Sequence, residues 1–219
     1  MPINKTFFHS VTEELQKQKA TLVAVSKTKP DTDIKALYDL GQRDFGENYV
    51  QELVEKSAKL PADIHWHFIG HLQSNKVKYI APFVHLIHAV DSFKLLKEIN
   101  KEAGKNNRTI PCLLQVHIAQ EETKFGLDEK ELEHLYLEYK NAGFNHVKVT
   151  GLMGMASFTD NMEIVRQEFK QLKSMFDRLQ KDAPDFGILS MGMSSDYLVA
   201  LEEGSNLVRI GSLLFGERN

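Results

Sequence analysis

The sequence contains one cysteine, Cys112, among its 219 residues. A single cysteine cannot form a disulfide within the chain, so a small disulfide-stabilised secreted domain is excluded. Cys112 lies in the apolar segment 110–116, where we expect an unreactive buried thiol. The N-terminus also lacks the basic and apolar regions of a secretory signal peptide. These absences predict a cytoplasmic protein.

Long apolar runs and an excess of one charge sign are lacking too. The most apolar stretch, residues 81–90, is too short to span a bilayer and contains His85 and His88. The 27 lysines and arginines nearly balance the 30 aspartates and glutamates, and the net charge is −3 at pH 7. Apart from residues 105–108 there is no basic block. We therefore expect neither a nucleic-acid nor a membrane partner.

What the sequence does contain is a regular alternation of short apolar segments with amphipathic helical segments. The strand pattern occurs in residues 22–26, 44–47, 65–69, 84–90, 110–118, 147–153, 188–191 and 207–210. Helical spacing occurs in residues 3–19, 32–40, 48–59, 71–80, 93–103, 128–141, 161–181, 195–203 and 213–216. Strands that alternate with helices predict an α/β fold with a parallel sheet, and eight such units predict a closed (β/α)8 TIM barrel.

We expect this barrel to form a single domain over residues 1–219, because no low-complexity linker or internal repeat divides the chain. The first helix, residues 3–19, has no strand before it, and we expect it to cap the bottom of the barrel. An open, doubly wound sheet is the alternative. That fold should carry a glycine-rich dinucleotide turn after its first strand, and residues 26–30, SKTKP, are not such a turn.

Lys27 follows the first predicted strand, at the end where barrel enzymes carry their chemistry. Burial lowers the pKa of a lysine, and a neutral amine can form a Schiff base with an aldehyde. Pro30 favours an extended backbone at Lys29, so we expect Lys27 to face the barrel mouth and Lys29 to face solvent. A Lys27 side chain that extends into solvent from the strand end is the alternative.

Two segments near the C-terminus have the composition of phosphate-binding turns. Residues 190–196, SMGMSSD, follow the seventh strand, and residues 209–212, RIGS, follow the eighth. Glycines and serines at a helix N-terminus offer free N–H groups and hydroxyls to an anion, and TIM barrels often bind phosphate at these two positions. Each segment alone could be an ordinary serine-capped helix start. Together they predict a phosphate site.

Two other kinds of site are less well supported by the residues. His65, His67 and His71 could hold zinc, but no carboxylate or cysteine completes a convincing ligand set in the sequence, so we expect no metal. Residues 192–196 have part of the pattern of a nucleophile elbow, but they lack its last glycine.

Six segments, in register along nearly the whole chain, resemble the family of pyridoxal phosphate homeostasis proteins. They are AVSKTKP at 24–30, FGENYVQE at 45–52, WHFIGHLQSNK at 66–76, GLMGM at 151–155, SMGMSSD at 190–196 and VRIGSLLFG at 208–216. The resemblance implies a barrel like the N-terminal domain of alanine racemase, with pyridoxal 5′-phosphate as cofactor.

The resemblance also implies which residues bind that cofactor. The family's imine-forming lysine falls on Lys27, its phosphate contacts on Ser194, Gly211 and Ser212, and Ser190 lies near them. The arginine that faces the pyridine nitrogen falls on Arg209, and the asparagine that lines the pocket falls on Asn48. No residue is assigned a catalytic role.

Two positions stay open. A loop lysine of the family falls on Lys124, whose role the sequence does not settle. His117 stands where relatives usually have asparagine, which leaves the contact of this strand end open.

The resemblance implies a carrier more than an enzyme. An arginine at the pyridine nitrogen keeps the ring unprotonated and makes it a weaker electron sink. Racemisation also needs a second base, and the chain ends at Asn219 without an evident one. We therefore expect a monomeric protein of intracellular pyridoxal phosphate (vitamin B6) homeostasis that stores, buffers or delivers the cofactor to dependent apoenzymes. A small pyridoxal-phosphate-dependent amino-acid racemase and a sugar-phosphate barrel enzyme are the alternatives.

Overall fold

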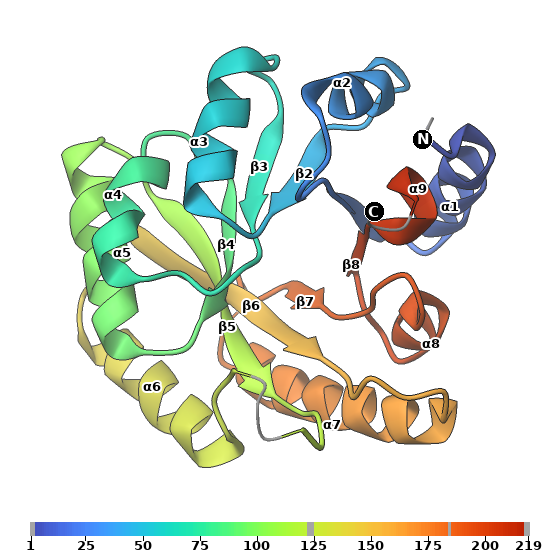
Figure 1. Ribbon diagram of the computed structural model, residues 1–219. Helices are drawn as coiled ribbons and strands as arrows, with labels where there is room; N and C mark the ends of the chain where they lie inside the picture. The colour runs from blue at the N-terminus through green and yellow to red at the C-terminus, as the bar shows by residue number, and fades with distance from the viewer. Residues whose placement is uncertain (1–2, 122–124, 184, 217–219) are drawn as a thin grey trace.

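The computed structural model describes residues 3–121, 125–183 and 185–216 (Figure 1). Within these residues, eight parallel strands form one closed barrel in the order of the sequence. They are β1 (Thr21–Val25), β2 (Asp44–Glu47), β3 (His65–Phe68), β4 (Leu86–Val90), β5 (Ile110–His117), β6 (Val147–Met155), β7 (Ile188–Ser190) and β8 (Leu207–Ile210). The last strand pairs with the first, from Thr21↔Leu207 to Ala24↔Ile210. The predicted (β/α)8 barrel is confirmed.

Helices surround the barrel and separate its strands (Figure 1). They are α1 (Lys5–Lys17), α2 (Asp31–Asp39), α3 (Val50–Lys59), the 3-10 turn η1 (Ser74–Lys76), α4 (Val77–Ile80), α5 (Phe93–Lys105), α6 (Glu129–Asn141), α7 (Met162–Gln180), α8 (Tyr197–Glu202) and α9 (Ser212–Phe215). The sequence predicted one helix over residues 71–80, but residues 71–73 are not helical. Leu72 is buried between exposed His71 and Gln73, an alternation that suits extended backbone rather than a helix.

Helix α1 does not cap the bottom of the barrel, contrary to expectation. It ends three residues before β1, at the amino end of the barrel, while the N–H of its N-cap Asn4 donates to Leu214 O beyond the carboxyl end of β8 (2.8 Å). The helix therefore runs along the outer wall beside α9 (Figure 1). Because α9 has only four residues, α1 supplies the apolar cover that this side of the barrel lacks, through buried Phe8, Val11 and Leu15.

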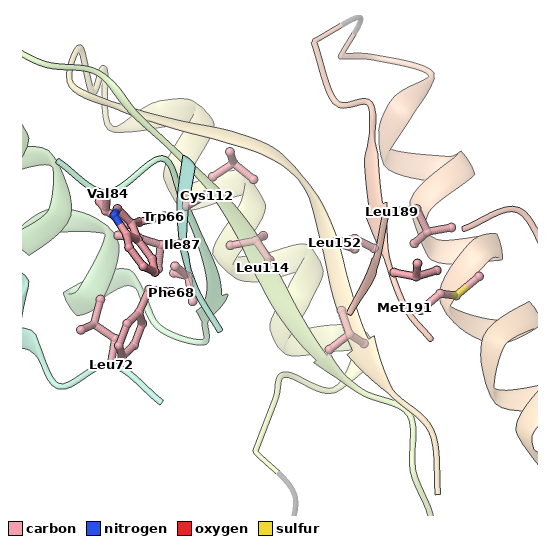
Figure 2. Packing of buried hydrophobic residues seen from close by; sticks show 14 of the residues in the cluster. Trp66, Phe68, Leu72, Val84, Ile87, Cys112, Leu114, Leu152, Leu189 and Met191 are labelled. Atoms are coloured by element: carbon pink, nitrogen blue, oxygen red, sulfur yellow. The ribbon is translucent and has the colours of Figure 1, made fainter. Parts of the chain in front are cut away.

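Most buried side chains pack between the barrel and its helices, as Figure 2 shows for residues such as Trp66, Phe68 and Leu114. Along β3, Trp66 and Phe68 face this layer, so His65 and His67 face the barrel interior. A smaller apolar cluster fills part of the interior: Val23, Leu86, Ala89, Leu113, Met153 and Leu207. None of the helices in the described ranges is long and apolar enough to cross a membrane.

Candidate functional site at the carboxyl end of the barrel

Lys27 lies in a tight turn immediately beyond β1 and is half-buried. The next residue, Thr28, has φ 64°, a left-handed conformation that a β-branched residue seldom adopts. The N–H of Thr28 donates to Glu52 Oε1 of α3 at 2.6 Å. A side chain from a neighbouring helix therefore holds the turn that carries Lys27 in a specific backbone geometry.

A buried charged network lies directly beneath this turn. Lys56 Nζ donates to Glu47 Oε1 (2.8 Å), to Glu52 Oε1 (2.6 Å) and to the carbonyl of Ser26 (2.8 Å). The hydroxyl of Ser26 donates to the same oxygen of Glu47 at 2.6 Å. Burial raises the pKa of Glu47, and the attraction of Lys56 opposes that rise. The network ties the end of β1 to β2 and α3, and so fixes the base of the Lys27 turn.

Lys29 does not face solvent as expected. It is half-buried, and its Nζ donates to the carbonyls of Phe215 and Gly216 at 3.1 Å each. The last carbonyls of a helix lack intrahelical partners, and a nearby lysine satisfies them. Lys29 thus joins the turn after β1 to the end of α9.

The loops after β7 and β8 meet next to the end of β1. The hydroxyl of Ser194 accepts the N–H of Gly211 at 3.3 Å, which joins the two loops. A Cβ at Gly211 would lie 3.3 Å from both Cβ and O of Val25, so this position favours glycine. Ser212, which is exposed, begins α9. The structure therefore brings Lys27, Ser194, Gly211 and Ser212 to one end of the barrel, as predicted.

The turn after β7 differs in one respect from the sequence prediction. Helix α8 begins at Tyr197, so Ser194 and Ser195 lie in the preceding turn and not in the helix. Asp196 Oδ1 accepts the N–H of Met193 at 2.6 Å and closes this turn. Gly192 has φ 96°, and a Cβ there would lie 2.6 Å from Ala200 Cβ, so only glycine fits.

Ser190 and Arg209 lie inside the barrel, because both face inward on β7 and β8. Arg209 Nη1 donates to Ser190 Oγ (2.5 Å) and Ser190 O (3.0 Å), and Nη2 donates to Gly154 O (3.0 Å). Burial lowers the pKa of Arg209 to about 10, against the attraction of Asp196. Arg209 therefore stays charged at neutral pH. The hydroxyl of Ser190 also contacts His88 Nδ1 at 3.2 Å, so this hydroxyl has two interior partners, Arg209 and His88.

Asn48 follows β2 and carries a polar atom that the protein does not satisfy. Its Oδ1 is buried and has no hydrogen-bond partner among the described residues. Asn48 also lines a groove of about 940 Å³ along α3, together with Tyr49, His71 and Tyr79. Buried acceptors without a donor are rare in folded proteins, and such an atom suits a bound group that donates to it.

Of the two open positions, His117 is the last residue of β5, and its Nε2 lies 2.9 Å from the carbonyl of Glu121 in the loop that follows. Phe125 stacks on His71, with ring centroids 4.8 Å apart. Lys124 lies outside the described residues.

Sequence reasoning missed the network of Glu47, Glu52 and Lys56. The i,i+4 spacing of Glu52 and Lys56 on α3 could have suggested an ion pair. The burial of Glu47 could not be inferred from the sequence, because a charged residue at the end of a strand usually faces solvent. Glu47 is buried only because Lys56 and Ser26 of neighbouring elements pack against it in the closed barrel.

The sequence matches the family described as "Alanine racemase, N-terminal domain" over residues 8–219. The pyridoxal phosphate homeostasis protein of Aquifex aeolicus is 45% identical over 204 residues, which cover 91% of this chain and 87% of the relative. The human protein of the same name is 40% identical over 212 residues, 90% of this chain and 76% of the relative.

Among solved structures, PipY of Synechococcus elongatus with PLP bound is 35% identical, with a TM-score of 0.83, over 94% of this chain and 99% of that one. The alanine racemase of Bartonella henselae is 19% identical, with a TM-score of 0.70, over 94% of this chain and 57% of that one, and shares the fold alone. By its sequence and its barrel, the chain belongs to the pyridoxal phosphate homeostasis protein family, which is built on the alanine racemase N-terminal domain.

Proposed function

We propose that the chain binds pyridoxal 5′-phosphate, holds it as a Schiff base of Lys27 and serves in its homeostasis by storing, buffering or delivering it. One observation carries this proposal: the rigid Lys27 turn lies at the same end of the barrel as the joined loops of Ser194 and Gly211. A lysine beside an anion-binding turn suits a ligand that has both an aldehyde and a phosphate. PipY, which is 35% identical, was solved with PLP bound.

The residues present fit such a ligand. Ser194, Gly211 and Ser212 offer hydroxyl and backbone donors for a phosphate at the start of α9. The buried Oδ1 of Asn48 is an acceptor without a protein partner among the described residues, so a donor on the ligand would satisfy it. When bound, the cofactor supplies an aldehyde that condenses with a neutral lysine amine and releases one water.

Arg209 is the candidate partner of the ring nitrogen. An arginine only donates hydrogen bonds, so the ring nitrogen it contacts must accept and remain unprotonated. This pairing weakens the ring as an electron sink and supports a carrier in preference to a racemase. Ser190 contributes indirectly, through its bond to Arg209.

The remaining expectations from the sequence belong to the same proposal. We propose that residues 1–219 act as one cofactor-binding domain, as a monomer in the cytoplasm, and that the recipients are apoenzymes that use pyridoxal phosphate. Sedimentation of the purified chain tests the monomer. Activation of an apoenzyme by the loaded chain, measured against the same concentration of free cofactor, tests delivery.

The central test is the absorbance spectrum of the chain with pyridoxal phosphate, before and after borohydride, followed by peptide mapping. We expect a visible band that borohydride removes and a pyridoxyl group on Lys27. Lys27→Ala should lose the adduct, while Lys35→Ala, on the exposed face of α2, should keep it. An adduct on another lysine would overturn the assignment. Chiral analysis after incubation with L- or D-alanine should show no racemisation.

A further inference from the structure

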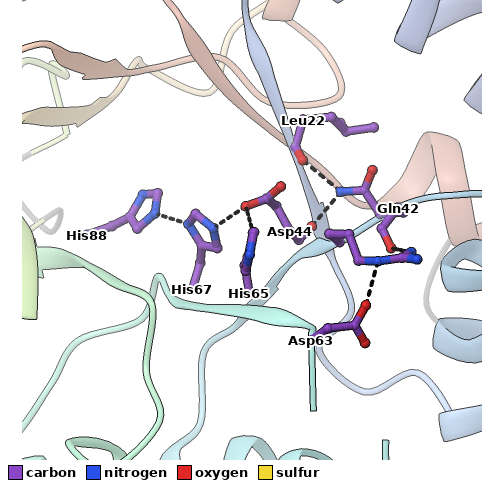
Figure 3. A network of polar contacts seen from close by, with 8 residues as sticks. Leu22, Gln42, Asp44, Asp63, His65, His67 and His88 are labelled. Atoms are coloured by element: carbon purple, nitrogen blue, oxygen red, sulfur yellow. Dashed lines mark hydrogen bonds and ion pairs between the residues drawn. The ribbon is translucent and has the colours of Figure 1, made fainter. Parts of the chain in front are cut away.

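A second cluster of polar side chains lies at the opposite, amino end of the barrel. Asp44 is the first residue of β2, His65 is the first residue of β3, and His85 immediately precedes β4. The register pairs Asp44 with His65, and His67 faces the interior two residues further along β3. Three neighbouring strands therefore bring one carboxylate and three imidazoles together, and Figure 3 shows His65 and His67 beside Asp44.

The distances in this cluster are short enough for one ion to join its members. Asp44 Oδ1 lies 3.0 Å from His67 Nε2 and 3.2 Å from His65 Nδ1. The ring of His85 stacks on that of His65, with centroids 4.4 Å apart, and its centroid lies 5.4 Å from that of His67. One ligand atom each from Asp44, His67 and His85 lies within 4.8 Å of the other two.

We propose that Asp44, His67 and His85 bind a divalent transition-metal ion of the zinc class, with His65 as an available fourth ligand. Zinc–nitrogen bonds of about 2.0–2.1 Å place tetrahedral ligand atoms about 3.3 Å apart. Asp44 already meets this spacing with His67 and with His65. His85 is exposed, so a side-chain rotation can bring its nitrogen closer. Imidazole and carboxylate are the donors that zinc takes in proteins.

The surroundings suit entry and binding of a cation. The side chains of Asp44 and His65 are 25% and 48% exposed, so an ion reaches the cluster from solvent. Asp44 supplies the one carboxylate among the three proposed ligands, and a carboxylate attracts a cation.

His67 also has the outer partner that metal-binding histidines require. Its Nδ1 lies 2.9 Å from His88 Nε2, whose own Nδ1 contacts Ser190 Oγ. Ionised Asp44 can only accept, so in the metal-free protein His67 carries its proton on Nε2 and His88 also carries its proton on Nε2. A metal at His67 Nε2 moves the proton of His67 to Nδ1, which then donates to His88 Nε2. The proton of His88 must consequently move to Nδ1 and point at Ser190.

The test is titration of the metal-free, untagged chain with Co²⁺, followed by its visible absorption, and then displacement by Zn²⁺. We expect one Co²⁺ per chain. Asp44→Asn and His85→Gln should each weaken binding by about tenfold or more. His134→Gln is the matched control, because His134 is exposed on α6 with Glu138 at 3.8 Å but lies outside the cluster; its affinity should equal that of the wild type.

A second measurement reports where the protons lie. In ¹⁵N NMR spectra of the histidine rings, saturating Zn²⁺ should change His88 from the Nε2–H to the Nδ1–H form, and His85→Gln should need about tenfold more Zn²⁺ or higher for the same change. No stoichiometric binding, binding that survives both ligand variants, or an equal loss in His134→Gln overturns the proposal. Because no step uses pyridoxal phosphate, these results stand apart from the test of Lys27.

Discussion

Lys56→Met should destabilise the fold by about 3–5 kcal/mol at neutral pH, because it leaves the Glu47 carboxylate buried without its partner. Lys56 and Glu47 have side-chain exposures of only 6% and 0%, and their charged atoms are 2.8 Å apart. Methionine keeps an unbranched apolar side chain of similar length, so lost packing contributes little. Denaturant unfolding of the variant and the wild type measures the difference.

The loss should also depend on pH in a defined direction. Burial holds the pKa of Glu47 above its ordinary value of 4.5, and Lys56 opposes that rise. Without Lys56 the folded pKa rises further, so the folded state binds more protons than the unfolded state between 4.5 and the new value. Stability then falls as pH increases through this window. The variant should therefore be closer to the wild type near about pH 5 than near about pH 8.

Two controls isolate the charge. Lys56→Met combined with Glu47→Gln should recover most of the lost stability, because the buried carboxylate is gone. Lys59→Met, on the same helix, removes a lysine that is 64% exposed and lies 3.8 Å from Asp31, and should change stability by about 1 kcal/mol or less. A loss for Lys56→Met no larger than that for Lys59→Met, or equal at both pH values, would refute this account.

Three further variants test the carboxyl end of the barrel. The double variant Ser194→Ala, Ser212→Ala should weaken pyridoxal phosphate binding about tenfold or more, because each hydrogen bond to a charged group contributes roughly 1.5–3 kcal/mol. A fluorescence titration measures the affinity, and an unchanged value would place the phosphate elsewhere. Gly192→Ala should destabilise the chain by about 1–3 kcal/mol in denaturant unfolding, because of its positive φ and the close contact with Ala200; a neutral effect would contradict the fit. Lys29→Ala should keep the Schiff-base band while loosening α9, visible as faster amide exchange there, and loss of the band would show that Lys29 carries the adduct.

Much of the fold could be predicted because each barrel unit has a local signature. The bounds of β2 and β8 agree with the sequence prediction, since turn residues and charged residues flank both segments. The position of α1 could not be predicted in this way. Helix α1 lies where it does because α9 has only four residues and leaves one side of the barrel uncovered. The local pattern of residues 3–19 predicts a helix but does not indicate which surface the helix covers.

The candidate site shows the same division. Positions that follow strand ends, such as Lys27 and Ser194, come together by topology alone. Lys29 was predicted wrongly, because its partners are backbone carbonyls of α9, far away in the sequence. For the histidines, the sequence grouped His71 with His65 and His67, although His71 follows β3 at the other end of the barrel. The histidines grouped from the sequence had no carboxylate beside them. The structure supplies Asp44, which lies next to His65 only because β2 pairs with β3.

Buried polar side chains connect the two ends of the barrel through its interior. TIM barrels usually fill the interior with branched apolar side chains, whereas here His67, His88, Ser190 and Arg209 occupy part of it beside the smaller apolar cluster. Buried polar groups are tolerated when each is hydrogen-bonded, and these four bond to one another in sequence, ending at Asp44. Along this series of contacts, the group that accepts from one histidine ring decides which nitrogen of that ring carries the proton. A change in the protonation or ligation of Asp44 would therefore change the tautomers of His67 and His88, and with them the contact to the Ser190 hydroxyl. A continuous path of polar contacts therefore links Arg209 inside the barrel to Asp44 at its amino end.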